Sequence, residues 1–197
     1  MSKEARRQDL LDAARKVFAE KGYHDAKVGD ISAAAHVAKG TFYLYFPDKR
    51  SVFVELIDTL FVRISSAILR VDTDGDVAAQ IKHNIRAILS VLVDHPESLR
   101  ILIAFGASVD PSVSNKIEAF YTGLKDLLAA SLLDGQDRGI VASGDVRLFA
   151  TFTIGALKEI LIEALNAPEG RRTREQIVED MFALLCSGYL RISLGKP

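Results

Sequence analysis

The sequence has little of what secreted and membrane proteins need. It contains one cysteine, Cys186, in 197 residues, which excludes an intrachain disulfide framework and favours a reducing compartment. No apolar run approaches the roughly 18 residues that a membrane-spanning helix requires. The charged start of the chain, residues 1–10, is not followed by the apolar stretch of a secretory signal. These absences predict a cytoplasmic protein that has no membrane partner.

The sequence also lacks the motifs of common enzymes and metal sites. It has no phosphate-binding glycine loop and no Gly-x-Ser-x-Gly elbow. The four histidines are dispersed, and none pairs with Cys186 or with carboxylates at metal-ligand spacing. Residues 72–76 look like the start of a calcium loop, but His83 stands where such a loop requires its twelfth residue, a glutamate. We therefore expect no enzyme activity, no cofactor and no metal.

Apolar residues recur at helical spacing nearly throughout the chain. From Leu10 to Phe18 they recur at intervals of three and four residues, and Gly22 follows as a helix stop. No segment shows the sustained alternation of a strand, so the sequence predicts an all-α fold. Further helices are expected near 28–35, 39–46, 53–68, 77–93, 97–105, 111–133, 145–166 and 173–193.

Charge is distributed unevenly along the chain. Residues 1–50 contain ten Lys and Arg against seven Asp and Glu, an excess of three positive charges, whereas the net charge of the whole chain is −1. A positive N-terminal part and a negative remainder are expected when only the N-terminal part meets the phosphates of a nucleic acid.

The segment 39–46 places different side chains on opposite faces of a helix. At 100° per residue, Phe42 and Phe46 fall on one face, where they complete a small core with Ile31 and Val37. A compact aromatic core alone accounts for the four aromatic residues, but it does not explain the glycine, lysine and threonine that stand among them. The spacing therefore predicts an outward surface made of Lys39, Gly40, Thr41, Tyr43, Leu44 and Tyr45.

This outward surface suits double-stranded DNA. Gly40 lets a backbone approach a groove closely, and hydroxyl and ammonium groups donate to phosphate oxygens. Lys39 has the reach for guanine O6 and N7, and Leu44 for a thymine methyl group. Lys49 adds a phosphate contact at the N-terminus of the next helix. Two short helices joined by a tight turn and followed by a long helix have the architecture of a helix-turn-helix domain.

The run from Ala14 to Tyr23, then Ile31 and Ala35, and the run from Lys39 to Lys49 resemble the N-terminal domain of the TetR family of transcriptional regulators. The rest of the chain resembles this family only in length and helical plan. The resemblance implies a homodimeric repressor of operator DNA that a small effector releases. It also implies a three-helix DNA-binding domain over residues 1–50, and a helical bundle over residues 51–197 for ligand binding and dimerisation.

Carried over by position, the DNA contacts of the family fall on Lys39, Gly40, Thr41, Tyr43, Leu44, Tyr45 and Lys49. Lys27 stands where the family usually has a threonine that caps the second helix. Lys27 still has the reach for phosphate, but Asp25 or another group must supply the cap. His36 replaces the usual turn glycine, at a position where a positive φ is expected. Gly29 and Ala38 replace side chains that in the family often contact DNA.

The segments 145–166 and 173–193 are apolar nearly all round. A helix without a polar face must be covered on both sides. In a chain of this size the second cover is expected to be another copy of the chain, which gives a symmetric four-helix interface. The alternative is that both helices lie in the centre of a monomer.

The C-terminal helices are also expected to enclose a ligand cavity. Because the candidate lining is mostly aliphatic and aromatic, it favours a small hydrophobic effector, such as a fatty acyl thioester, an aromatic compound or a multidrug cation. The alternative function is that of an all-α small-molecule carrier or enzyme that uses the same cavity. The candidate lining residues are His83, Phe105, Phe120, Tyr121, Phe149 and Phe152, with Asn84, Lys158 and Glu159 as further polar groups.

Overall fold

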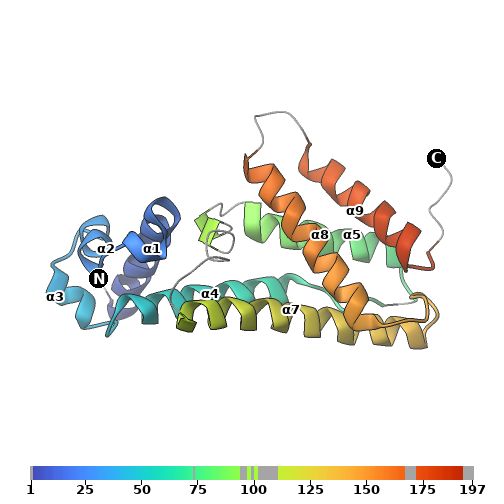
Figure 1. Cartoon of the computed structure of the whole chain (residues 1–197), viewed down its shortest axis with the longest axis horizontal. Coiled ribbons are helices and arrows are strands. Elements are labelled where there is room, and N and C mark those ends of the chain that lie inside the picture. Colours follow the sequence, from blue (N-terminus) through green and yellow to red (C-terminus); the bar gives the residue numbers. More distant parts are fainter. Residues whose placement is uncertain are drawn as a thin grey trace. The chain divides into compact units, whose positions relative to one another are not determined.

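The computed structural model describes residues 2–72, 74–93, 97–98, 100–101, 111–166 and 172–192. Over these residues the secondary structure is helical apart from an isolated bridge between Val141 and Leu190, which confirms the predicted all-α fold (Figure 1). None of the helices described is long and apolar enough to cross a membrane. The helices are α1 (Lys3–Asp25), α2 (Val28–Ala34), α3 (Lys39–Tyr43), α4 (Lys49–Ala67), α5 (Val77–Val93), α7 (Pro111–Asp137), α8 (Val146–Asn166) and α9 (Arg174–Gly188).

The chain divides into two compact units. The first unit comprises Met1–Val62 and His95–Phe120, and the second comprises Arg63–Asp94 and Tyr121–Pro197. Helices α4 and α7 each contribute residues to both units. The predicted division of function at residue 50 stays a prediction. Residue 50 is the second residue of α4.

The core of the first unit follows from the periodicity of α1. Leu10, Ala14 and Phe18 stand four residues apart and are all buried, as expected for one face of a helix. The ring of Phe18 packs against Tyr23 at 5.6 Å and against Phe53 of α4 at 5.7 Å between ring centroids. These aromatic contacts hold α4 to α1 and fix the base on which the two short helices rest.

Gly22 interrupts α1 where the sequence predicts a stop. Its backbone has φ 74° and ψ 164°, a combination that glycine adopts readily and L-residues avoid. A Cβ atom at this position would meet nothing within 4 Å. The backbone conformation therefore requires the glycine here, and the available space does not.

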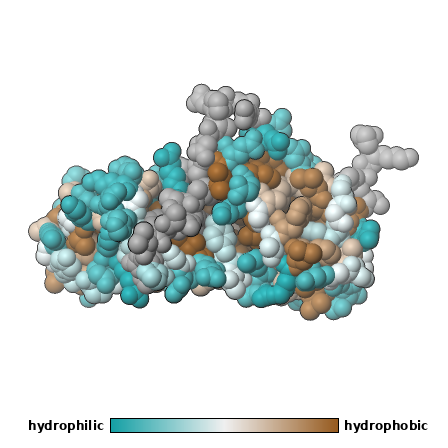
Figure 2. All heavy atoms as spheres, in the orientation of Figure 1, coloured by the Kyte–Doolittle hydropathy of each residue, from teal (hydrophilic) through white to brown (hydrophobic). Residues whose placement is uncertain are grey.

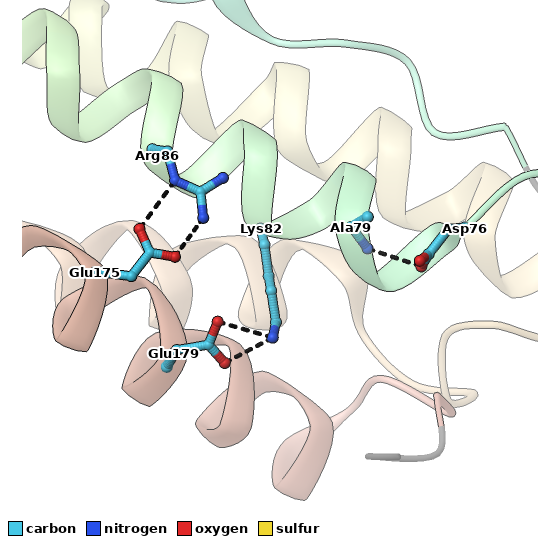
Figure 3. A network of polar contacts seen from close by, with 6 residues as sticks. All are labelled: Asp76, Ala79, Lys82, Arg86, Glu175 and Glu179. Carbon is cyan, nitrogen blue, oxygen red and sulfur yellow. Dashed lines mark hydrogen bonds and ion pairs between the residues drawn. The ribbon is translucent and has the colours of Figure 1, made fainter.

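In the second unit, α5 and α9 are joined by packing and by ion pairs. Lys82 pairs with Glu179 at 2.6 Å, and Arg86 pairs with Glu175 at 2.5 Å (Figure 3). All four side chains are partly or fully exposed, so each pair is expected to contribute no more than about 1 kcal/mol. Their main effect is to fix the register of the two helices, because each pair matches one turn of α5 with one turn of α9.

Helix α7 continues beyond the predicted end at residue 133 and includes Gly135 and Asp137. The chain then folds back, and the Val141 side chain packs directly on the Cα of Gly135, where a Cβ would lie 2.6 Å from Val141. The connection between the helices predicted near 111–133 and 145–166 is thus shorter at its N-terminal end. Gly135 does not end the helix. Because it has no side chain, it lets the segment around Val141 pack closely against α7.

Candidate nucleic-acid interface

The turn between α2 and α3 has the geometry of a helix-turn-helix. His36 adopts φ 54°, which confirms the expectation that this position requires a positive φ. The His36 N–H donates to the Ala33 carbonyl at 3.0 Å, and the Val37 N–H donates to the Ser32 carbonyl at 2.9 Å. These bonds end α2 and direct the chain into α3, so the histidine performs the role that a turn glycine usually has.

The cap of α2 is provided from inside the helix. Lys27, the N-cap residue, has no side-chain acceptor, and its own N–H donates to Oδ2 of Asp30 at 2.9 Å. The other oxygen of Asp30 accepts from Lys21 Nζ at 2.9 Å. The Lys21 bond and then the Lys27 bond lower the pKa of the Asp30 carboxyl. Asp30 rather than Asp25 is therefore the capping group, and its spacing of three residues from the N-cap is the sequence signal that would have identified it.

Helix α3, the second helix of the helix-turn-helix, and the turn after it separate their side chains as the spacing predicts. Phe42 and Phe46 are 0% and 2% exposed, and their ring centroids lie 5.8 Å apart. On the opposite face Tyr43 is 50% and Leu44 77% exposed. Lys39 and Gly40 are also exposed, and Thr41 and Tyr45 are half-buried. The prediction is confirmed for the inward phenylalanines and for the outward Lys39, Gly40, Tyr43 and Leu44, whereas Thr41 and Tyr45 are only partly outward.

Tyr43 is held in place on the surface by the core beneath it. Its ring packs edge-on against Phe42 with 5.5 Å between centroids, a favourable arrangement for an aromatic pair. The helix ends at Tyr43, but the N–H groups of Tyr45 and Phe46 both donate to the Phe42 carbonyl at 3.0 Å. The outward residues thus lie on an ordered segment that projects from a fixed aromatic core.

Comparisons with known proteins agree with this geometry. Residues 10–56 match the profile of bacterial regulatory proteins of the tetR family. The fatty acid metabolism regulator protein of Bacillus subtilis (strain 168) is 29% identical over 156 residues, which cover 76% of this chain and 78% of the regulator. Residues 10–56 therefore form an N-terminal domain like that of the TetR family of transcriptional regulators. The HTH-type transcriptional repressor DhaR of Mycobacterium sp. (strain GP1) is 35% identical over 71 residues, 36% of each chain.

Solved structures share the fold over nearly the whole length of this protein. The fatty acid degradation regulator FadR from Bacillus halodurans superimposes with a TM-score of 0.79 at 25% identity, covering 92% of this chain and 98% of that one. FadR from Bacillus subtilis in complex with stearoyl-CoA gives a TM-score of 0.78 at 24% identity, with the same coverage. The expected plan of an N-terminal helix-turn-helix domain and a helical C-terminal part is therefore confirmed.

Lys49 occupies a different position from the one expected for a phosphate contact. Its ammonium group donates to the carbonyls of Tyr23, His24 and Ala26 at 2.7, 3.0 and 2.8 Å, and it lies 4.5 Å from the centroid of the Tyr23 ring. An ammonium has three N–H donors, and these bonds use all three. Lys49 closes the C-terminal end of α1, where a cation satisfies the last carbonyls. A phosphate contact from Lys49 would require at least one of these bonds to break.

Replacing Lys49 with methionine is expected to destabilise this protein by about 1–3 kcal/mol, because the half-buried carbonyls at the end of α1 lose their donor. Urea unfolding at several wavelengths provides the measurement. Lys39→Met, at an exposed position of α3, is the matched control and should unfold at the wild-type urea concentration. Equal stability of the two variants would show that the Lys49 bonds do not hold the domain together.

The candidate effector residues lie in several places. Phe105 is outside the described residues. Phe120 is buried in the first unit, where it packs against Phe61 at 6.0 Å. In the second unit Phe149 stacks on Tyr189 at 4.7 Å. Phe152 is 55% exposed and His83 is exposed, so within a single chain neither of these two lines an enclosed cavity.

In the second unit, the ammonium group of Lys158 lies over the ring of Tyr121. Lys158 Nζ lies 5.6 Å from the centroid of the Tyr121 ring. Burial, and then the negative charge of Glu159, raise the pKa of the Tyr121 phenol to about 12. Tyr121 is therefore even less prone to ionise than an ordinary tyrosine, whose pKa of about 10 already keeps it neutral at physiological pH.

Helices α8 and α9 expose apolar side chains. Leu148 and Phe152, four residues apart on α8, are 62% and 55% exposed, and Leu184 on α9 is 54% exposed. Figure 2 shows hydrophobic residues gathered over the part of the surface that these helices form. Large apolar residues clustered in this way mark interaction surfaces on globular proteins.

Proposed function

We propose that this protein is a TetR-family regulator that binds palindromic operator DNA as a homodimer, represses transcription, and leaves the operator when a small hydrophobic effector binds its C-terminal part. The division of α3 into a buried phenylalanine face and an exposed polar face carries the proposal. A helix with such an exposed face, placed second in a helix-turn-helix, enters the major groove. The alternative of an all-α carrier or enzyme gains no support from the relatives, which are named as regulators.

Each outward residue of α3 has a defined task in this proposal. The hydroxyl groups of Thr41, Tyr43 and Tyr45 donate to phosphate oxygens and set the register of the protein on the duplex. Lys39 and Leu44 contact base edges, the first at guanine and the second at a thymine methyl group. Phosphate contacts from Lys27, at the exposed start of α2, complete the interface.

Gly40→Ala separates the fit of α3 to DNA from its stability. A Cβ at Gly40 would meet nothing within 4 Å inside the protein, so the variant should be as stable as wild type or more stable by up to about 1 kcal/mol. The added methyl group should nevertheless weaken operator binding severalfold, because it stands between the backbone and the groove. Gly29→Ala, an equally open position in α2, should weaken binding less. Unchanged binding by Gly40→Ala would exclude a close approach of this backbone to DNA.

The dimer is proposed to form through α8 and α9, which would cover Leu148, Phe152 and Leu184 in a four-helix interface. The two recognition helices must then reach half-sites about 34–36 Å apart, one turn of the duplex. Selection of a random duplex library by the purified regulator tests this directly. The expected result is a palindromic sequence bound by two copies, and selection of no sequence would refute the proposed function.

We propose a long-chain fatty acyl thioester as the effector. The support is that the relative covering 76% of this chain is named a fatty acid metabolism regulator, and that a structural neighbour is described in complex with stearoyl-CoA. Effector binding has to favour a state of the dimer that binds DNA poorly, because a ligand shifts an equilibrium only by its differential affinity.

Stearoyl-CoA is therefore expected to release the regulator from the selected duplex at micromolar concentration, and free coenzyme A is expected to have no effect. Fluorescence anisotropy of the labelled duplex follows the release, with acetyl-CoA as a short-chain control. Release by free coenzyme A as well would indicate competition by phosphates alone, and no release by stearoyl-CoA would exclude this effector class while leaving DNA binding standing.

A further inference from the structure

Arg7 of α1 connects α4 with the end of the recognition helix. Its two terminal nitrogens donate to the two carboxylate oxygens of Glu55 on α4. The same guanidinium lies over the ring of Phe46, with 4.6 Å from Cζ to the ring centroid. Arg7, Glu55 and Phe46 all belong to the first compact unit. One planar group thus contacts both α4 and Phe46, a buried residue of the turn that follows α3.

From Phe46 a continuous series of ring contacts leads to the DNA-facing surface. Phe46 packs against Phe42 at 5.8 Å, and Phe42 packs against Tyr43 at 5.5 Å. Phe46 and Phe42 are both buried, whereas Tyr43 is half exposed. Because buried rings are closely packed, a displacement of Phe46 has to move Phe42 and, with it, the exposed phenol.

The Arg7–Glu55 pair is suited to orientation rather than to stability. The two side chains are 32% and 28% exposed, and pairs with this degree of exposure contribute little to folding. Their bidentate geometry, however, fixes the plane of the guanidinium, and this plane lies over Phe46. The energy of the pair is small, but its geometric constraint acts on Phe46, three residues after the end of α3.

The pair also lies next to a second link on α4. Asp58, three residues after Glu55, pairs with Lys116 of α7. Consecutive turns of α4 are therefore tied to α1 through Glu55 and to α7 through Asp58. The ion pairs with α1 and α7 fix the orientation of α4. The Arg7 guanidinium, which is bound to Glu55 of α4, in turn restricts the position of the Phe46 ring.

We infer that Arg7 and Glu55 are positioning residues for operator binding, which set the orientation of α3 without contacting DNA. This inference rests on the proposed function of α3. Both charged nitrogens of Arg7 that face Glu55 are engaged there, which distinguishes Arg7 from the exposed cations assigned to phosphate. Glu55 carries a negative charge, so it cannot itself favour a polyanion.

Because Glu55 is negatively charged, the direction in which its replacement changes DNA affinity tests the inference. Glu55→Gln removes a negative charge from the DNA-binding unit, and the general electrostatic effect is tighter binding to DNA. Loss of positioning has the opposite effect, because α3 no longer presents its residues in the geometry of the groove. We expect weaker binding, by about tenfold for the dimer, because misorientation weakens one base contact in each subunit without removing it.

The experiment measures binding by fluorescence anisotropy over a salt series. The probes are the duplex that the wild-type regulator selects from a random library and an unrelated duplex of the same length. Glu55→Gln and Arg7→Lys should each weaken binding to the selected duplex about tenfold and leave the salt dependence unchanged. Binding to the unrelated duplex should not weaken. Arg7→Lys keeps the charge but loses the planar fork, so it tests geometry alone.

Glu20→Gln is the matched control, because Glu20 is an exposed carboxylate of α1. It should bind the selected duplex as tightly as wild type or slightly more tightly. Melting temperatures close to wild type are expected for all three variants. If Glu55→Gln binds as tightly as Glu20→Gln, the inference is overturned. A fourth variant, Arg7→Gln, removes the charge itself, and the inference is also overturned if this variant reduces the salt dependence by about two ions, one for each subunit, since Arg7 would then contact a phosphate. Failure of the wild-type protein to select any duplex refutes the proposed function instead.

Discussion

Tyr43→Ala is expected to reduce operator affinity by roughly 100-fold while the regulator stays folded. Tyr43 is 50% exposed on the outward face of α3, so its removal leaves no cavity in the core. A hydrogen bond to a charged group contributes about 1.5–3 kcal/mol, which corresponds to roughly tenfold or more for each subunit. A dimer loses this contact twice. The loss should appear in binding to the selected duplex and not in the melting temperature.

Tyr43→Phe divides this effect into its two parts. It removes only the hydroxyl group and keeps the ring edge-on to Phe42. If the phenol donates to phosphate, the phenylalanine variant should lose most of the affinity that the alanine variant loses. If the ring itself provides the contact, Tyr43→Phe should bind like wild type. Wild-type affinity in both variants would remove Tyr43 from the interface.

Phe152→Glu is expected to convert the regulator into a monomer that binds the selected duplex at least about 100-fold more weakly. Phe152 is 55% exposed on α8, beside the exposed Leu148 one turn earlier. A carboxylate placed in an apolar interface has to lose its hydration without a partner, and two-fold symmetry applies this cost twice. Loss of the dimer also removes the gain that two linked half-site contacts provide.

Analytical ultracentrifugation and anisotropy on the same samples measure both effects. Leu69→Glu is the matched control, because Leu69 is 50% exposed outside α8 and α9, and this variant should remain dimeric. A Phe152→Glu protein that still sediments as a dimer would place the interface on another surface. A monomeric variant that binds DNA with wild-type affinity would contradict the proposed binding by a dimer.

The face of α3 could be predicted from the sequence because it depends only on helical periodicity. Phe42 and Phe46 are four residues apart, and any helix places such residues on one face. The prediction did not require knowledge of the partners of these rings. The positive φ of His36 could be expected from a family resemblance, since the turn has the same length and position in the chain.

The roles of Lys49 and Arg7 could not be predicted in the same way. Lys49 bonds to carbonyls 23 to 26 residues earlier in the chain, and Arg7 pairs with a residue 48 positions later. Neither pairing leaves a periodic signal, because it depends on where the folded helices place a long side chain. At the sequence level Lys49 could not be distinguished from a surface lysine that meets phosphate.

The amino-acid sequence by itself determined the helical class, the helix-turn-helix and the inward and outward faces of its third helix, because these follow from local spacing and backbone preference. Only the tertiary structure decided which polar groups support this surface, since Lys49, Asp30 and Arg7 obtain their roles from the carbonyls, ammonium groups and rings that folding brings to them. It also showed that His83 and Phe152 are exposed in the single chain, because the face a helix buries depends on its neighbours as well as on its own residues.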